Sequence, residues 1–134
     1  MPDFTLTDEQ RNIRDLAHDF ADKEIRPVAW DYDRGSTWPA AIIDKALEVG
    51  LMNSQIPTAY GGAGASYVDG TLIGEELAWG CAAIATTLGA NELAAVPVLL
   101  GGSDQVKAKY LGMLTEDRKL ASFCLTEPDA GSDV

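Results

Sequence analysis

The sequence has 134 residues, enough for one domain with a hydrophobic core of its own. It carries 10 Lys and Arg against 21 Asp and Glu, which gives a formal net charge of −11. A protein that binds nucleic acid or an anionic membrane surface needs a basic face, so this acidic balance predicts neither partner. The sequence has no uninterrupted run of 18 apolar residues, and on that ground we expect no membrane-spanning helix.

Residues that commonly bind metals are few and scattered. Cys81 and Cys124 lie far apart and His18 is the sole histidine, so the spacing predicts no zinc or other metal site. Two unpaired thiols are typical of a reducing compartment. The acidic N-terminus has neither the features of a secretory signal nor the arginines of a transit peptide. We therefore expect a cytoplasmic protein, and a processed organellar protein would look the same.

The first predicted helix begins after Thr7. The side chains of Thr7 and Gln10 can form a capping box, in which each accepts from the other residue's backbone N–H. Pro27 predicts that the regular helix is perturbed or ends there. We expect no chemical role for His18 on this helix. Apolar residues at helical spacing predict one buried face, made of Ile13, Leu16, Ala17, Phe20, Ala21 and Ile25.

A second helix is predicted between Pro39 and Gly50. Proline suits the first helical position, and glycine suits the left-handed residue that follows a helix. The inward stripe of this helix is Ile42, Ile43, Ala46 and Leu47.

The glycine-rich loop of residues 61–66 precedes a third helix, predicted over residues 67–79 with Ser66 as its cap. Glycines before a helix suit phosphate binding, but this loop lacks the preceding strand and the spacing of phosphate-binding motifs. A flexible turn is the favoured interpretation. Glu75 and Glu76 are adjacent on the third helix and point about 100° apart, which favours surface charges over a catalytic pair.

Residues 81–100 are almost all apolar or small and predict a long helix buried between layers. Ser103 is the predicted cap of a fifth helix, followed by a turn over residues 115–119. Residues 120–125 then suit a β-strand. The inward residues predicted on the fifth helix are Val106, Tyr110, Leu111 and Leu114.

The last eleven residues, 124–134, form a short turn rich in small residues. The hydroxyl of Thr126 follows an apolar run and can point at a ligand that lies against the end of that run. The small residues Ala130, Gly131 and Ser132 leave backbone N–H groups open to a close-lying pyrophosphate. A plain Pro-Asp turn explains the same residues about equally well.

Residues 124–134 also match the first signature of the acyl-CoA dehydrogenases position by position. The pattern is a small residue, an aliphatic residue, Ser or Thr, then Glu, and after a short variable stretch Gly, Ser and Asp. Asp129 is a departure, because many relatives carry glycine there. Segments 50–53, 56–57, 60–62, 74–78 and 109–111 resemble the helical N-terminal domain of the medium-chain branch. The chain therefore resembles this family over essentially its whole length.

This resemblance implies an all-α fold, with an N-terminal helical domain in residues 1–119. Residues 120–134 would be the first strand of a middle β-domain that the sequence does not contain. It implies non-covalently bound FAD, an acyl-CoA substrate that undergoes α,β-dehydrogenation as in β-oxidation, and electron transfer flavoprotein as the acceptor. It also implies a homotetramer, cytoplasmic in a bacterium or in the mitochondrial matrix. The family's catalytic base lies in a further C-terminal domain, so the 134 residues alone should be inactive.

The resemblance assigns candidate roles by position. The residues expected to bind the cofactor are Phe123, Cys124, Leu125, Thr126, Gly131 and Ser132. Ser132 would also lie near the thioester of the substrate, and Gly89 would line the far end of the acyl pocket. Two alternatives stay open: a helical interaction module without enzymatic activity, and a dehydrogenase that acts on another thioester, such as a branched-chain or glutaryl one.

Overall fold

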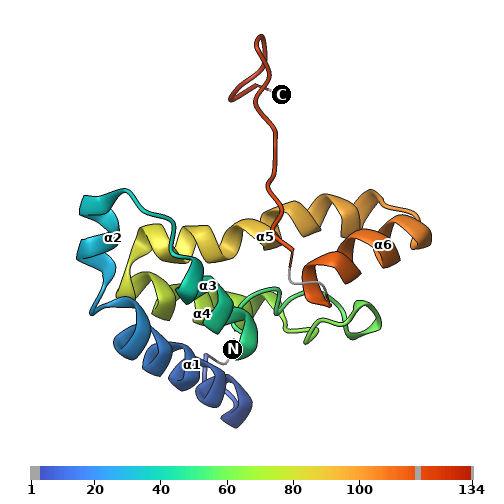
Figure 1. Cartoon of the computed structure of the whole chain (residues 1–134). Coiled ribbons are helices and arrows are strands. Elements are labelled where there is room, and N and C mark those ends of the chain that lie inside the picture. Colours follow the sequence, from blue (N-terminus) through green and yellow to red (C-terminus); the bar gives the residue numbers. More distant parts are fainter. Residues whose placement is uncertain (1–3, 117–118, 134) are drawn as a thin grey trace.

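The computed structural model describes residues 4–116 and 119–133, and its regular structure in these residues is helical, which confirms the predicted fold class (Figure 1). The helices are α1 (Asp8–Phe20), α2 (Ala29–Gly35), α3 (Ala40–Glu48), α4 (Tyr67–Gly80), α5 (Ala82–Gly101) and α6 (Asp104–Thr115). A π-helical turn, η1 (Ala21–Ile25), follows α1, and a 3-10 turn, η2 (Thr58–Tyr60), lies in the loop before α4.

The start of α1 confirms the predicted capping box. Gln10 N–H donates to Thr7 Oγ1 at 3.1 Å, and Thr7 N–H donates to Gln10 Oε1 at 3.0 Å. The regular helix ends at Phe20, and the chain continues as η1 up to the turn at Pro27. The predicted buried face is confirmed at four positions and wrong at Leu16, which is exposed. The buried positions are Ala17, Phe20, Ala21 and Ile25.

The first half of the chain packs α1 and η1 against α4. Gly80 at the end of α4 lies so close to η1 that a Cβ there would be 3.0 Å from the Cβ of Ala21 and 3.1 Å from side-chain atoms of Ile25. The core also takes in the inward residues of α3, at Ile42, Ile43 and Ala46.

The prediction did not include α2, a helix of seven residues. At α3 the prediction was wrong by one residue, since Pro39 is the residue before the helix and not its first turn. Gly50 takes the expected left-handed conformation, with φ of +76°. Ser66 caps α4 as predicted, and its hydroxyl accepts from Asp69 N–H at 3.2 Å.

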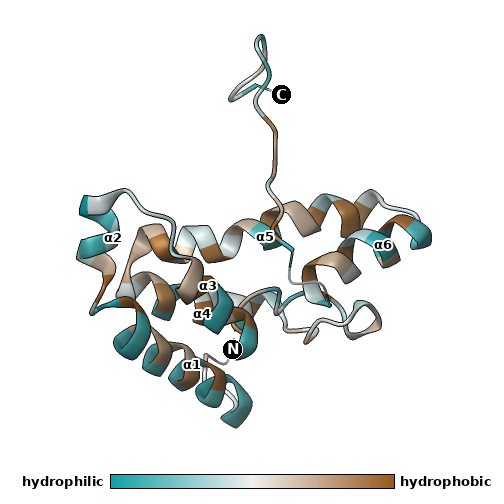
Figure 2. Cartoon of the chain, in the orientation of Figure 1, coloured by the Kyte–Doolittle hydropathy of each residue, from teal (hydrophilic) through white to brown (hydrophobic). Residues whose placement is uncertain are grey.

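The long helix α5 turns two different faces to its surroundings. Its buried face is formed by Ile84, Leu88, Asn91 and Ala95. The opposite face is exposed at Ala82, Thr86, Leu93, Pro97 and Leu100, with the half-buried Gly89 in the middle of that stripe. Within the described residues α5 is therefore covered on one side, so the predicted burial between layers is found on one face of the helix only. Figure 2 shows α5 mostly in brown and white, interrupted by a hydrophilic segment near its middle.

The length and composition of α5 also satisfy a test for a membrane-spanning helix, although 22% of the tested window is buried in the structure. From the sequence we expected no helix of this kind, and that expectation was wrong, because α5 has the length and composition of one. One helix of this kind is weak evidence for a membrane span, because core helices pass the same test.

The second half of the chain forms a smaller core between the loop before α4, α5 and α6, made of Ile56, Ala95, Leu111 and Leu114. Val106 and Tyr110 were predicted to point inward, and both are exposed. Asn53 Nδ2 donates to the carbonyl of Leu114 at 2.9 Å, and Thr115 Oγ1 donates to the carbonyl of Tyr60 at 2.8 Å. These two bonds tie the end of α6 to the loop. Residues 117 and 118 of the predicted turn lie outside the described residues.

The predicted strand over residues 120–125 is not formed in the described part of the chain. These residues have no regular secondary structure, and the one β-bridge in the tail joins Glu127 to Ala130. A strand needs a neighbour for its backbone groups, and no described segment pairs with this one. In Figure 1 the tail runs away from the helices.

Candidate functional site

The predicted cofactor residues all lie in the tail, residues 120–133. Phe123, Cys124, Leu125, Thr126, Gly131 and Ser132 are exposed. Glu127 and Ala130 close a tight turn through reciprocal backbone bonds, Glu127 N–H to Ala130 O at 2.9 Å and Ala130 N–H to Glu127 O at 3.2 Å. Thr126 precedes this turn in the chain, and Gly131 and Ser132 follow it. Val134, the last residue of the motif, lies outside the described residues.

The tail offers hydrogen-bond donors that are not used internally. Within residues 4–116 and 119–133, no hydrogen bond engages the hydroxyl of Thr126 or that of Ser132. Around Gly131, a Cβ would meet no atom within 4 Å. A motif with small residues and open donors suits a ligand with polar oxygens, such as a phosphate or the edge of a polar ring.

Gly89 lies elsewhere, in the middle of α5. A Cβ built on it meets no atom within 4 Å, so it faces open space from the exposed side of the helix. The structure does not bring Gly89 and the tail residues into one cavity. What joins the two places is the connection between α5 and residues 119–121: the amide of Asn91 bonds both Lys119 O and Ala121 N–H.

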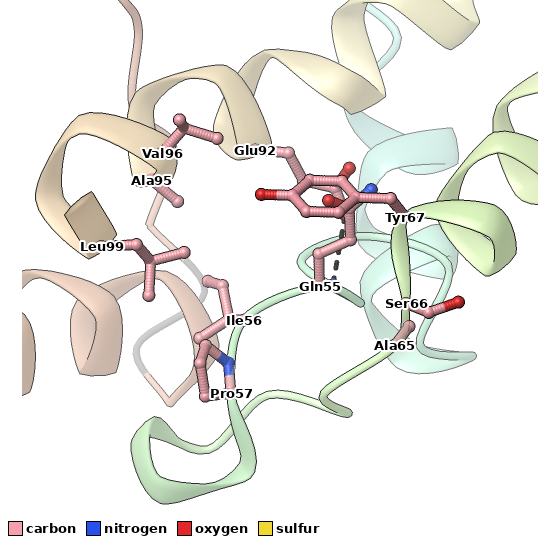
Figure 3. Close-up of a pocket in the computed structure, with 10 residues that line it drawn as sticks. All are labelled: Gln55, Ile56, Pro57, Ala65, Ser66, Tyr67, Glu92, Ala95, Val96 and Leu99. Atoms are coloured by element: carbon pink, nitrogen blue, oxygen red, sulfur yellow. Dashed lines mark hydrogen bonds between the residues drawn. The ribbon is translucent and has the colours of Figure 1, made fainter.

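A separate pocket of about 310 Å3 lies between the loop before α4 and the second half of α5 (Figure 3). Its walls are mainly apolar, from Ile56 and Pro57 on the loop and Val96 and Leu99 on α5. Figure 3 shows the ring of Tyr67 lying across the polar end of the pocket. The volume is at the low end for a small-molecule site, which is roughly 300–1,000 Å3.

The carboxylate in this pocket is already engaged. Glu92 Oε1 accepts from Ser54 Oγ at 3.1 Å and from Gln55 N–H at 3.4 Å. These bonds hold the loop against α5. Besides Glu92, the pocket lining carries the hydroxyls of Tyr67 and Ser66, and the Ser66 hydroxyl is bonded to Asp69. The lining therefore presents no free acid–base pair and no activated nucleophile. We interpret it as a packing hollow between the loop and α5.

Sequence reasoning missed several polar contacts because each joins distant segments. His18, for which we expected no chemical role, has its Nδ1 at 2.7 Å from Glu76 Oε2 and its ring centroid 4.4 Å from that of Trp79. The guanidinium of Arg26 lies 4.2 Å from the centroid of the Trp79 ring. These contacts cross to α4 from α1 and from the residue that follows η1, and they are structural. The two buried asparagines, Asn53 and Asn91, were likewise missed, and the signal for Asn91 was a polar residue within an apolar run.

The cap of α4 lowers the pKa of one carboxyl, that of Asp69. The hydroxyl and the backbone N–H of Ser66 both donate to Asp69 Oδ2, at 2.7 and 2.8 Å, and lower the pKa of that carboxyl below its ordinary value. The hydrogen bonds favour the ionised form. This shift belongs to the start of α4 and lies away from the tail.

Comparison with known proteins assigns the helical body. The family model described as "Acyl-CoA dehydrogenase, N-terminal domain" matches residues 7–118. A probable medium-chain specific acyl-CoA dehydrogenase of Caenorhabditis briggsae is 40% identical over 131 residues, which are 98% of this chain and 32% of that protein.

Two solved structures have the same fold. Butyryl-CoA dehydrogenase of Megasphaera elsdenii superposes with a TM-score of 0.87 at 38% identity, over 98% of this chain and 36% of that one. An acyl-CoA dehydrogenase of Bacillus anthracis complexed with FAD superposes with a TM-score of 0.80 at 30% identity, over 99% of this chain and 23% of that one.

The chain thus spans about a third of the length of the relatives it matches. The family match covers every helix from α1 to α6, and the motif that resembles the family's first signature begins at residue 124, six residues beyond the last matched residue. The chain belongs to the acyl-CoA dehydrogenase family and carries the helical N-terminal domain of that family.

Proposed function

We propose that this chain is the N-terminal part of an FAD-dependent acyl-CoA dehydrogenase that introduces a double bond between Cα and Cβ of an acyl-CoA. The observation that carries the proposal is the tail motif, which follows the matched domain and presents open donors at Thr126, Gly131 and Ser132. Relatives named for this activity support it.

The tail residues fit one side of an FAD site. The hydroxyls of Thr126 and Ser132 are free within the described chain, and Gly131 leaves room for a close approach. Thr126 would hold the polar edge of the flavin, and Gly131 and Ser132 would lie along the cofactor with Ser132 also near the thioester. When bound, FAD supplies the acceptor for the hydride that leaves the β-carbon. The general base would come from outside these 134 residues, and the chain alone should show no turnover.

The exposed face of α5 suits one wall of the acyl pocket. It is apolar or small over several turns, and Gly89 at its centre leaves space where a larger side chain would fill the pocket. Another part of the protein must cover this face to exclude water from the acyl chain. The relatives include medium-chain and butyryl-CoA dehydrogenases, so family membership alone leaves the acyl length open.

The remaining expectations concern the whole protein. We propose electron transfer flavoprotein as the electron acceptor, a homotetramer as the assembly, and the bacterial cytoplasm or the mitochondrial matrix as the location. Among the alternatives, a branched-chain or glutaryl substrate would use the same flavin contacts, while an interaction module would not need the free donors of the tail.

The proposal is tested by Thr126→Val in the full-length holoenzyme. This change removes the hydroxyl and nearly keeps the volume, so flavin affinity should fall by about 1–2 kcal/mol, with a shifted flavin absorption band. Thr37→Val, at an exposed threonine outside the tail, is the matched control and should leave both unchanged. A wild-type protein that purifies without flavin and cannot be reconstituted with FAD would refute the proposed function.

A further inference from the structure

Asn91 is the most buried polar side chain among the described residues, with 1% of its surface exposed. It lies on the inward face of α5, between Leu88 and Ala95, where the neighbouring inward residues are apolar. A buried amide costs free energy unless its donor and acceptor are both satisfied. Whether the burial of Asn91 is tolerated therefore depends on which groups bond its amide.

Both partners of Asn91 belong to the backbone that leads into the tail. Its Nδ2 donates to the carbonyl of Lys119 at 3.1 Å, and its Oδ1 accepts from Ala121 N–H at 2.8 Å. The two bonds fix the peptide groups on either side of Leu120. A leucine at this place would suit the apolar surroundings and the helix, so burial alone does not explain an amide.

These are also the last hydrogen bonds between the tail and the helical body in the described chain. Residues 122–133 bond only among themselves, through Ser122 with Cys124 and Glu127 with Ala130. The Ala121 side chain packs on the core formed by Ile56, Leu111 and Leu114. The two bonds of Asn91 thus fix the point at which the tail leaves the helices, and they fix which peptide groups of the tail face α5.

Register matters because the tail leaves the helices as a drawn-out, uncoiled trace (Figure 1). In an extended segment successive side chains point to opposite sides, and each residue advances the chain by about 3.3 Å. A slip by one residue at Ala121 would move Thr126 by that distance and turn its hydroxyl to the other side. Hydrogen bonds tolerate only a few tenths of an ångström, so such a slip would remove the contact.

We infer that Asn91 is a positioning residue, which sets the register of the flavin-binding tail against α5. The effect on flavin binding rests on the proposed function, whereas the two hydrogen bonds of Asn91 are observed in the structure. Residues 89 and 91 are two apart on a helix and point to nearly opposite sides. One helix thus carries Gly89, facing the proposed acyl chain, and Asn91, which holds the segment that reaches the flavin.

The first experiment measures amide hydrogen exchange in the 134-residue chain. Asn91→Leu removes both bonds and keeps the branched shape of four side-chain heavy atoms, so the amide of Ala121 should exchange about 5–10-fold faster, as expected for the loss of one net hydrogen bond. Asn91→Asp keeps an acceptor for this amide and should retain more of the protection. Leu88→Ala is the matched control: it opens a cavity on the same face of α5 one turn away and leaves both bonds intact.

Exchange at the periphery proceeds by local opening, so the cavity in Leu88→Ala should leave Ala121 protected even where the whole chain is less stable. Equal exchange at Ala121 in wild type and Asn91→Leu, with circular dichroism showing folded protein, would overturn the inference. Faster exchange in Leu88→Ala to the same extent would also overturn it, because the protection would then report global stability.

The second experiment measures flavin in the full-length holoenzyme. Asn91→Leu should raise the Kd for FAD about tenfold and shift the flavin absorption band, while Leu88→Ala leaves the band in place. An unchanged Kd and spectrum in Asn91→Leu would overturn the positioning role even if exchange at Ala121 is faster. If the wild type binds no flavin, the proposed function fails, and the exchange experiment alone then decides whether Asn91 holds the tail.

Discussion

At the scale of single residues, the loop before α4 leaves no room for a side chain at Gly62. A Cβ on this residue would lie 1.9 Å from the carbonyl oxygen of Ile56, which itself accepts from Gly64 N–H at 2.9 Å. We expect Gly62→Ala to destabilise the chain by about 1–3 kcal/mol, because backbone must move to relieve the overlap. Urea unfolding followed by circular dichroism measures the change.

The control for this prediction is Gly74→Ala in the interior of α4. A Cβ at Gly74 meets no atom within 4 Å, and alanine is the better helix former, so this change should stabilise by about 0.5–1 kcal/mol. Opposite signs for the two substitutions are the expected result. A stabilising or neutral Gly62→Ala would show that the loop rearranges freely.

The cap of α4 should make part of the stability dependent on pH. The folded pKa of Asp69 is lowered, first by the Ser66 hydroxyl and then by its backbone N–H, so the contribution is complete above the unfolded pKa and is lost as pH falls through the folded value. We expect Ser66→Ala to lower the free energy of unfolding at pH 7, by about 0.5–2 kcal/mol. At pH 3 the difference from wild type should be smaller. A difference that is constant or grows between pH 7 and pH 3 would contradict this account.

Local chemistry explains which residue-level features could be predicted. The capping box at Thr7 and the left-handed Gly50 depend on residues within one turn of each other, and both predictions were confirmed. Asn53 and Asn91 bond backbone groups of distant segments, so their roles depend on the packing of α5 and α6 and could not be read from spacing. The roles proposed for Thr126, Ser132 and the other tail residues stay predictions.

At the scale of elements, the bounds of α5 were predictable but its orientation was not. Gly101 and the apolar run set its length, within one residue of the prediction. Its composition is apolar all round, so the sequence does not say which face packs inward. For the short α2 the apolar pattern was too brief to predict a helix. For the tail a strand was predicted from residues that have no pairing partner in the described part of the chain.

The outward face of α5 leads to a prediction about substrate length. In the holoenzyme, Gly89→Leu should shorten the proposed acyl pocket and shift preference toward shorter chains by about 10–100-fold in kcat/KM, since a misplaced methylene is worth roughly 1–3 kcal/mol. Steady-state kinetics with acyl-CoA of graded length measures the shift. The 134-residue chain should not lose stability and should gain up to about 1 kcal/mol, because the new side chain enters open space and leucine is the better helix former. An identical chain-length profile would place Gly89 outside the pocket.

At the scale of the whole molecule, the uncovered face of α5 should promote self-association. Leu93 and Leu100 lie two turns apart on that face and are 59% and 80% exposed. The net charge of −11 opposes association, but at physiological salt repulsion is screened beyond ~8 Å. We expect the isolated chain to associate with rising concentration in light scattering and to bind a hydrophobic dye.

The matched variant carries Leu93→Lys and Leu100→Lys, which interrupt the stripe without touching the buried face of α5. It should be monomeric over the same concentrations and bind less dye. A monomeric wild type with low dye binding would show that the exposed face of α5 does not drive self-association. Equal association of the wild type and the variant would place the contact elsewhere on the molecule.

The close approach of η1 to Gly80 has a consequence for the order of folding. α4 and α5 are separated by Cys81 alone, so they can pair early and at little entropic cost, whereas α1 and η1 reach α4 only after residues 26–66 have closed as a loop. The seam between Ala21 and Gly80 should therefore form late, after the rate-limiting step. Weakening it would leave the folding rate nearly unchanged and speed unfolding, so the lifetime of the folded chain depends on how tightly its first helix docks.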